Sequence, residues 1–126
     1  MGGTVAAGAA VPYDFLISLA PNSRISLPSP GNIQISDTGY YQISFGVYGS
    51  TTTSFTFQVS INGVLDPATK ATSRVNFGQG MMTGLIRITQ NPSTVSIINI
   101  NAATFTAANS SVVYPAFLAI IKLAPL

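Results

Sequence analysis

Few side chains in this sequence could act in catalysis or bind a metal ion, and the carboxylates are the main candidates. Asp14, Asp37 and Asp66 are the only acidic residues, they lie far apart in the sequence, and no His or Cys is present. This composition excludes a Ser-His-Asp triad, an imidazole acid–base switch, a thiolate nucleophile and a Cys-based metal site. A paired-carboxylate site would need folding to bring two of the Asp residues together. We therefore predict no enzyme activity, no cofactor and no metal site.

Several other short motifs are compatible with ligand binding or glycosylation but are also common in ordinary loops and strands. Gly78-Gln79-Gly80 lacks the Lys of a phosphate-binding loop, so it predicts an ordinary loop. Asn109-Ser110-Ser111 fits an N-glycosylation sequon, and residues 51–54 (Thr-Thr-Thr-Ser) could accept O-linked sugar or form an exposed polar loop. Tyr40 and Tyr48 fall on the polar side of an alternating segment, where they could stack on a sugar or shield a neighbouring strand or subunit.

The scarcity of charge is a stronger indication than any motif. Five Lys and Arg and three Asp make up 6% of the 126 residues, and apolar residues make up 47%. Ordinary soluble domains devote about a quarter of their residues to charged side chains. Five scattered cations form no stripe for a phosphate backbone, so we expect no nucleic-acid binding. The composition predicts a Ser/Thr-rich outer face and a large apolar face buried against identical subunits.

The apolar residues follow the periodicity of β-strands throughout. Residues 41–47 and residues 55–61 alternate apolar and polar side chains, which places one face of each strand inward. Asn62-Gly63 follows the second run and predicts a tight turn, because this dipeptide readily takes positive φ. Further strands are predicted at residues 15–19, 32–35, 84–89, 94–100 and 113–123. No segment has helical periodicity, so the predicted fold class is an all-β sandwich or jelly roll.

Two runs near the end of the chain are apolar on both faces, residues 94–100 and residues 112–123. One face of a strand in a two-layer sandwich normally meets water, so these runs indicate either scattered surface apolar residues or a subunit interface. The low charge favours the interface. The residues predicted for the interface or the core are Tyr41, Ile43, Phe45, Ile98, Ile100, Tyr114, Phe117, Leu118 and Ile120. Residues 112–121 are too short to span a bilayer, so no membrane insertion is expected.

Several segments resemble, in this order, parts of complement C1q/tumour-necrosis-factor-like (C1q/TNF-like) heads. Residues 38–45 (Thr-Gly-Tyr-Tyr-Gln-Ile-Ser-Phe) resemble the Gly-x-Tyr strand of these heads, residues 59–63 (Val-Ser-Ile-Asn-Gly) their central strand, and residues 114–118 (Tyr-Pro-Ala-Phe-Leu) their terminal strand. Residues 11–14 (Val-Pro-Tyr-Asp) and 35–41 (Ile-Ser-Asp-Thr-Gly-Tyr-Tyr) resemble the C-terminal domain of the collagen-like spore-surface (exosporium) glycoproteins of Bacillus.

This resemblance implies a jelly-roll β-sandwich of the C1q/TNF-like type that assembles as a homotrimer. It also implies a structural role, in which the head sets the register of an N-terminal collagen-like Gly-X-Y stalk. The head would form the exposed tip of a filament on the bacterial spore surface (exosporium) or another extracellular surface. No Gly-X-Y repeat occurs in these residues. Residues 1–10 are accordingly predicted to be a tether or a fragment edge, and residues 11–126 the head.

A second function stays open on the same fold. The domain could be an adhesin module that binds host surface proteins or glycans through exposed loops at residues 49–54 and 66–76. Calcium occurs in some C1q-like heads, but three scattered Asp residues give little support for it here. In either role, Phe45 and Phe117 are predicted to be buried aromatic positions in the packed strands.

Overall fold

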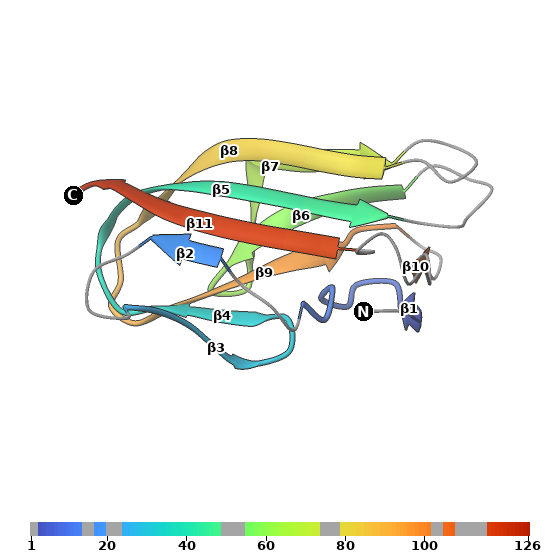
Figure 1. Cartoon of the computed structure of the whole chain (residues 1–126), viewed down its shortest axis with the longest axis horizontal. Helices are drawn as coiled ribbons and strands as arrows, with labels where there is room; N and C mark the ends of the chain where they lie inside the picture. The colour runs from blue at the N-terminus through green and yellow to red at the C-terminus, as the bar shows by residue number, and fades with distance from the viewer. Residues whose placement is uncertain are drawn as a thin grey trace.

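Eleven strands and no helix make up the residues described by the computed structural model of this chain (Figure 1). These residues are 3–13, 17–19, 24–48, 55–73, 79–101, 105–107 and 116–126. In chain order the strands are β1 (Gly3–Val5), β2 (Ile17–Leu19), β3 (Ile25–Ser29), β4 (Asn32–Ile35), β5 (Gly39–Tyr48), β6 (Phe55–Ile61), β7 (Val64–Ser73), β8 (Gln79–Ile88), β9 (Ser93–Asn99), β10 (Phe105–Ala107) and β11 (Ala116–Ala124).

The strands form two packed sheets, which confirms the predicted all-β sandwich. The four-stranded sheet has the order β2-β11-β5-β8, and the five-stranded sheet has the order β3-β4-β9-β6-β7. Strands β1 and β10 form a separate short pair. Among the described pairs only β2 and β11 are parallel. Strands β7 and β8 lie side by side at the edge where the two sheets meet (Figure 1).

The hydrophobic core lies between the sheets and is built from alternate residues of the long strands. In β5, Tyr41, Ile43 and Phe45 are fully buried, whereas Tyr40 on the other side of the strand is 41% exposed. The opposing sheet contributes buried side chains from β4, β6 and β9: Ile33, Ile35, Phe57, Val59, Val95 and Ile97. Because successive side chains of a strand point to opposite faces, the alternation in the sequence decides which side chains enter the core.

Two glycines are required by the backbone. Strands β6 and β7 form a hairpin whose turn is Asn62-Gly63, with φ of 52° and 83°, as the sequence predicts. The Oδ1 atom of Asn62 accepts a hydrogen bond from the Thr94 backbone nitrogen at 2.9 Å, which ties this turn to β9. Gly39 opens β5 with a φ of 153°, and a Cβ atom there would lie 2.5 Å from the carbonyl oxygen of Ala124.

Strands β3 and β7 are not predicted by the sequence analysis, because each contains a Pro. Pro28 lies in β3 and Pro67 lies in β7. Both are edge strands of the five-stranded sheet, where Pro is tolerated because an edge strand has a side with no ladder partner. Strand β7 also corrects the predicted loop at residues 66–76, since β7 extends to Ser73. The rest of that loop and the loop at residues 49–54 lie outside the described residues.

Strand boundaries differ from the prediction at several other places. Strand β8 begins at Gln79, well before the predicted start at Gly84. The loop predicted for Gly78-Gln79-Gly80 is therefore wrong at its last two positions. The Asn109-Ser110-Ser111 sequon lies outside the described residues, as do residues 15–16, 51–54 and 113–115.

Residues 3–13 form an N-terminal strap that packs onto the head. Strand β1 pairs with β10, with Val5 opposite Phe105. Ala10 forms an isolated β-bridge with Ile98 of β9. This bridge lies on the same edge of β9 that pairs with β4 at the beginning of the strand. The predicted boundary between a tether (residues 1–10) and the head (residues 11–126) falls inside this strap. Described residues on both sides of the boundary contact the head.

Buried side chains and long-range hydrogen bonds hold the strap. Val5, Val11 and Tyr13 belong to the core. The Nδ2 atom of Asn99 donates to the carbonyl oxygen of Val5 at 3.0 Å. The Tyr13 hydroxyl crosses the sandwich and donates to the carbonyl oxygen of Gly46 at 3.1 Å, and burial raises the pKa of this phenol. The strap therefore completes the core instead of lying on its surface.

One carboxylate joins three parts of the chain at the end of the sandwich. Asp37, between β4 and β5, pairs with Lys122 of β11 and with Arg24 directly before β3. The Tyr41 hydroxyl donates to the main-chain carbonyl oxygen of Asp37 at 2.7 Å. The hydrogen bond from Lys122, together with the positive charges of Lys122 and Arg24, holds the pKa of the Asp37 carboxyl below its usual value.

The substitution Phe45→Ala should lower the free energy of unfolding by about 3–5 kcal/mol, because it empties a fully buried aromatic site. Urea unfolding at a fixed protomer concentration measures this loss. The matched control is Val64→Ala, at a side chain 70% exposed, which should change the free energy by less than about 0.5 kcal/mol. A Phe45 variant as stable as this control would show that Phe45 contributes nothing to the core.

Stability should fall in acid. Because the folded-state pKa of Asp37 is lowered, its ion pairs stabilise the fold fully above the unfolded-state pKa of about 3.9. This contribution is lost as the pH drops through the lower folded-state value. The melting temperature should therefore be flat above about pH 5 and fall below about pH 4. Asp37→Asn should be less stable at neutral pH and should show a shallower acid decline. An identical acid decline in that variant would assign the acid sensitivity to other groups.

Candidate functional site

The nine residues predicted for a trimer interface or the core do not form one surface. Five of them are buried between the two sheets: Tyr41, Ile43, Phe45, Leu118 and Ile120. Ile98 lies half-buried in β9, and the half-buried Ile100 follows directly after that strand. Tyr114 and the Phe117 side chain lie outside the described part of the structure. Their place in an interface stays a prediction, and a binding surface has to be sought on the outward side of the strands.

The described carboxylates do not form a catalytic pair. Asp37 follows β4, whereas Asp66 lies on β7, three strand spacings away across the sheet, or roughly 14 Å. Asp14 lies outside the described residues. In the described ranges, no three His, Cys, Asp or Glu side chains gather where they could hold a metal ion. The same ranges contain no helix of a length and apolarity suited to crossing a membrane.

The surface best suited to binding is the outward side of the four-stranded sheet. Residues directly opposite each other on neighbouring antiparallel strands share a face, so the outward residues of β5 identify those of β8 and β11. Tyr40, Gln42 and Ser44 are the outward residues of β5, with Thr83, Leu85 and Arg87 opposite them on β8 and Ala119 and Ile121 opposite them on β11. Together these eight residues are the open face.

The open face combines apolar and uncharged polar side chains. Leu85 is 62% exposed and Tyr40 is 41% exposed. The Ser44 and Thr83 hydroxyls hydrogen-bond to each other at 3.0 Å across β5 and β8, so this polar pair is satisfied within the sheet. Arg87, near the end of β8, is the one charged residue of the open face. A sheet surface of this composition suits contact with another protein, because covering it leaves few charges to desolvate.

The sequence predicts part of the open face and misses the rest. Ala119 and Ile121 lie in residues 112–123, a run whose two apolar faces favour an interface, and Tyr40 is predicted to meet a sugar, a neighbouring strand or a subunit. Leu85 of β8 is not predicted.

Leu85 and Ile86 are successive apolar residues of β8, and Ile86 is buried whereas Leu85 is exposed. Ile120 and Ile121 of β11 are related in the same way, with Ile120 in the core and Ile121 half-buried on the outward side. A search for successive apolar residues therefore finds Leu85 and Ile121 once each strand's inward side is known.

Solved structures of tumour-necrosis-factor-type proteins share this fold. Eiger TNF from S. frugiperda matches with a TM-score of 0.60 at 12% identity, over 98% of this chain and 87% of that chain. Murine APRIL at pH 8.0 matches with a TM-score of 0.59 at 19% identity, over 83% of this chain and 78% of that chain. Pika GITRL matches with a TM-score of 0.50 at 15% identity, over 84% of this chain and 83% of that chain.

The likeness is one of structure and not of sequence. No protein-family model matches this chain, and no curated protein matches it in sequence. At identities this low a structural match establishes the fold, while activity and partners have to be argued from the surface itself. The chain folds as a jelly-roll β-sandwich of the C1q/TNF-like type.

Proposed function

We propose that this domain is a structural homotrimerisation head whose three copies meet through the open face. The observation that carries the proposal is the open face itself, a sheet surface with an exposed Leu85 and a single charge, Arg87. Burial of its apolar area contributes about 25 cal/mol per Å². The free-energy cost of desolvating buried ions often cancels such gains. This cost is small here, because only one of the eight open-face residues is charged.

The size of the open face indicates how the copies meet. Strands β5 and β8 have ten residues each, so a four-stranded sheet of this length measures roughly 19 Å by 33 Å, or about 600 Å². A stable interface buries about 800 Å² on each partner. A second surface must therefore contribute. In a ring of three, each subunit meets its two neighbours through two different surfaces. The open face would be the first of these surfaces, and the adjacent β7–β8 edge is suited to be the second.

The sequence resemblance to collagen-like spore-surface glycoproteins extends the proposal. In this role the head holds three N-terminal Gly-X-Y chains in register and forms the tip of a filament on the spore surface or another extracellular surface. The course of the strap supports this arrangement, because β1, the first described strand, lies away from the end where β11 finishes (Figure 1). A stalk joined there would leave the Asp37 end of the sandwich pointing outward.

Binding of host surface proteins or glycans, the alternative function, is compatible with the same assembly. Such binding would use surfaces other than the open face, since the trimer covers that face. The separation of Asp37 and Asp66 supports a non-enzymatic role in either case.

Leu85→Asp should break the trimer, because it places a carboxylate in each of the three contacts while removing the most exposed apolar side chain of the open face. Sedimentation velocity at micromolar concentration should show monomers or unfolded chains. Ser29→Asp is the matched control, since it introduces the same charge at an exposed residue of β3, the edge strand farthest from β7 in the other sheet. Intact trimers of both variants would remove the open face from the interface.

The registration role is tested by joining a short Gly-X-Y sequence to Met1, with and without the domain. A trimeric head holds three chain ends at high effective concentration, which makes the first turns of the triple helix effectively intramolecular. Circular dichroism should show faster refolding with the head, and refolding whose rate is independent of chain concentration. The Leu85→Asp head is the control and should restore the slow, concentration-dependent rate. Equal rates with and without the wild-type head would leave surface recognition as the better hypothesis.

A further inference from the structure

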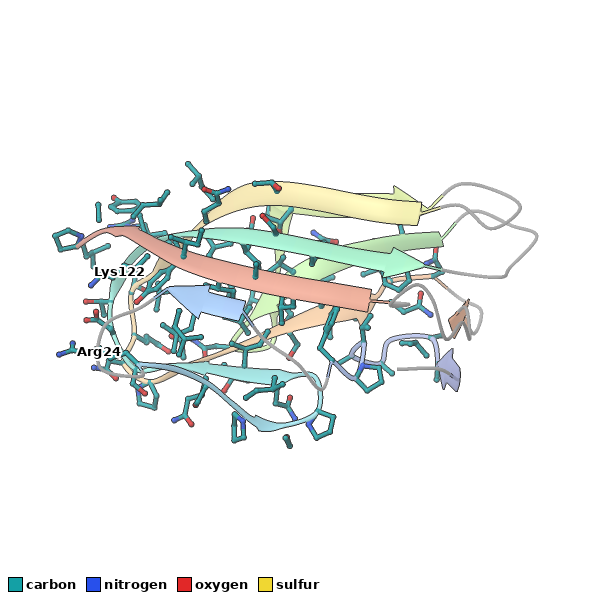
Figure 2. The ribbon with its side chains drawn as sticks, viewed as in Figure 1. Arg24 and Lys122 are labelled. Atoms are coloured by element: carbon teal, nitrogen blue, oxygen red, sulfur yellow. The ribbon has the colours of Figure 1, made fainter. Side chains whose placement is uncertain are left out.

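Two cations converge on a single carboxylate at the end of the sandwich where β11 finishes. Figure 2 shows Arg24 and Lys122 at this end, and both side chains pair with the carboxylate of Asp37. The Nη1 atom of Arg24 lies 3.3 Å from Oδ1 of Asp37, and Nζ of Lys122 donates to Oδ2 of the same carboxylate. Two positive charges and one negative charge leave this cluster with a net charge of +1.

The cluster retains donors that Asp37 does not use. A guanidinium has five N–H groups and an ammonium has three, which is more than one carboxylate accepts. Among the described residues, Asp37 is the only ion-pair partner of either cation. The side chains are reachable, since Arg24 is 45% exposed and Lys122 is 19% exposed. Arg24 and Lys122 are thus held close together by Asp37, with N–H groups left for a further acceptor.

We propose that Arg24 and Lys122 form a binding site for a sulfate or phosphate group, with Asp37 as a built-in competitor. Such an oxyanion has several acceptor oxygens and carries enough negative charge to offset the surplus of the cluster. The guanidinium presents a fork of donors and the ammonium adds a point charge. Asp37 positions both cations in the absence of a ligand and weakens binding by occupying part of their donors. The intrinsic affinity of one site is therefore low.

Assembly would convert this weak site into a stronger one, a step that rests on the proposed trimer. Lys122 lies near the end of β11, in the sheet that carries the open face, so a three-fold assembly would place its three copies of the cluster at the same end of the trimer. Three sites held together favour a ligand that carries many oxyanions on one chain over a free ion. A sulfated polymer and free sulfate present the same chemistry, and their affinities separate the two sources.

The test uses the whole protein and inorganic sulfate, with chloride at equal ionic strength as the reference. Wild-type protein should give saturable ¹H–¹⁵N shifts at Arg24 Nε and near Lys122. Arg24→Gln should weaken sulfate binding about tenfold, the loss expected for a hydrogen bond between charged groups. Ser29→Asp lowers the net charge by the same amount at the far end of β3, outside the open face and the β7–β8 edge, and should change the affinity by less than about twofold. Equal losses in both variants, or no saturable shift in wild type, would overturn the proposal.

A second variant gives the opposite sign. Asp37→Asn removes the competitor while keeping the main-chain oxygen that Tyr41 contacts, so sulfate affinity should rise by about threefold or more. A purely structural ion cluster predicts no such gain. Dextran sulfate should bind the trimer at least about a hundredfold more tightly than free sulfate, and equal affinities would assign the site to the free ion. Sedimentation of the same samples reports the trimer separately, so failure of anion binding leaves the proposed assembly untouched.

Discussion

The scarcity of charge is the constraint on which the rest of this structure depends. The protomer exposes 6532 Å² of surface, and five Lys or Arg and three Asp are the only charged residues available to it. Hydroxyl and amide side chains have to supply the remaining polarity, and many of them are already hydrogen-bonded within the protein. Low charge removes the usual electrostatic barrier to association, so the composition that limits solubility also favours assembly.

The same constraint explains why the polar interior is so fully satisfied. Among the described residues, no buried side-chain nitrogen or oxygen lacks a hydrogen-bond partner. Asn99 is completely buried, and its amide group bridges the strap to Asn101 near the end of β9. An unpaired amide in this position would cost more free energy than one surface ion pair returns. Hydrogen bonds of neutral side chains, such as the Asn99 amide, thus fix the position of the strap. In domains with more charged residues, ion pairs can take this role.

Local patterns in the sequence predicted the parts of the fold that local rules control. The alternation around Phe45 and Phe57 was sufficient to place β5 and β6, and Asn62-Gly63 was sufficient to place the tight turn after β6. Strands β3 and β7 escaped prediction because Pro28 and Pro67 are acceptable only at a sheet edge, and edges are known only once the strand order is known. The β8 residues of the open face escaped for a related reason. The inward side of β8 depends on its pairing with β5, which no local pattern reveals.

The strap ties the beginning of the chain to almost its last strands, and this governs the order in which the protein can be made. The hydrogen bond from Asn99 to Val5 spans 94 positions of sequence, so Val5 and its neighbours stay unpaired until β9 has been synthesised. Contacts this distant slow folding, because the intervening chain must be confined before they form. The strap consequently docks only after most of the sandwich has been made. A chain that ended before residue 99 would lack part of the core against which Val5 and its neighbours pack. Cellular quality control would treat such a chain as an incompletely folded protein.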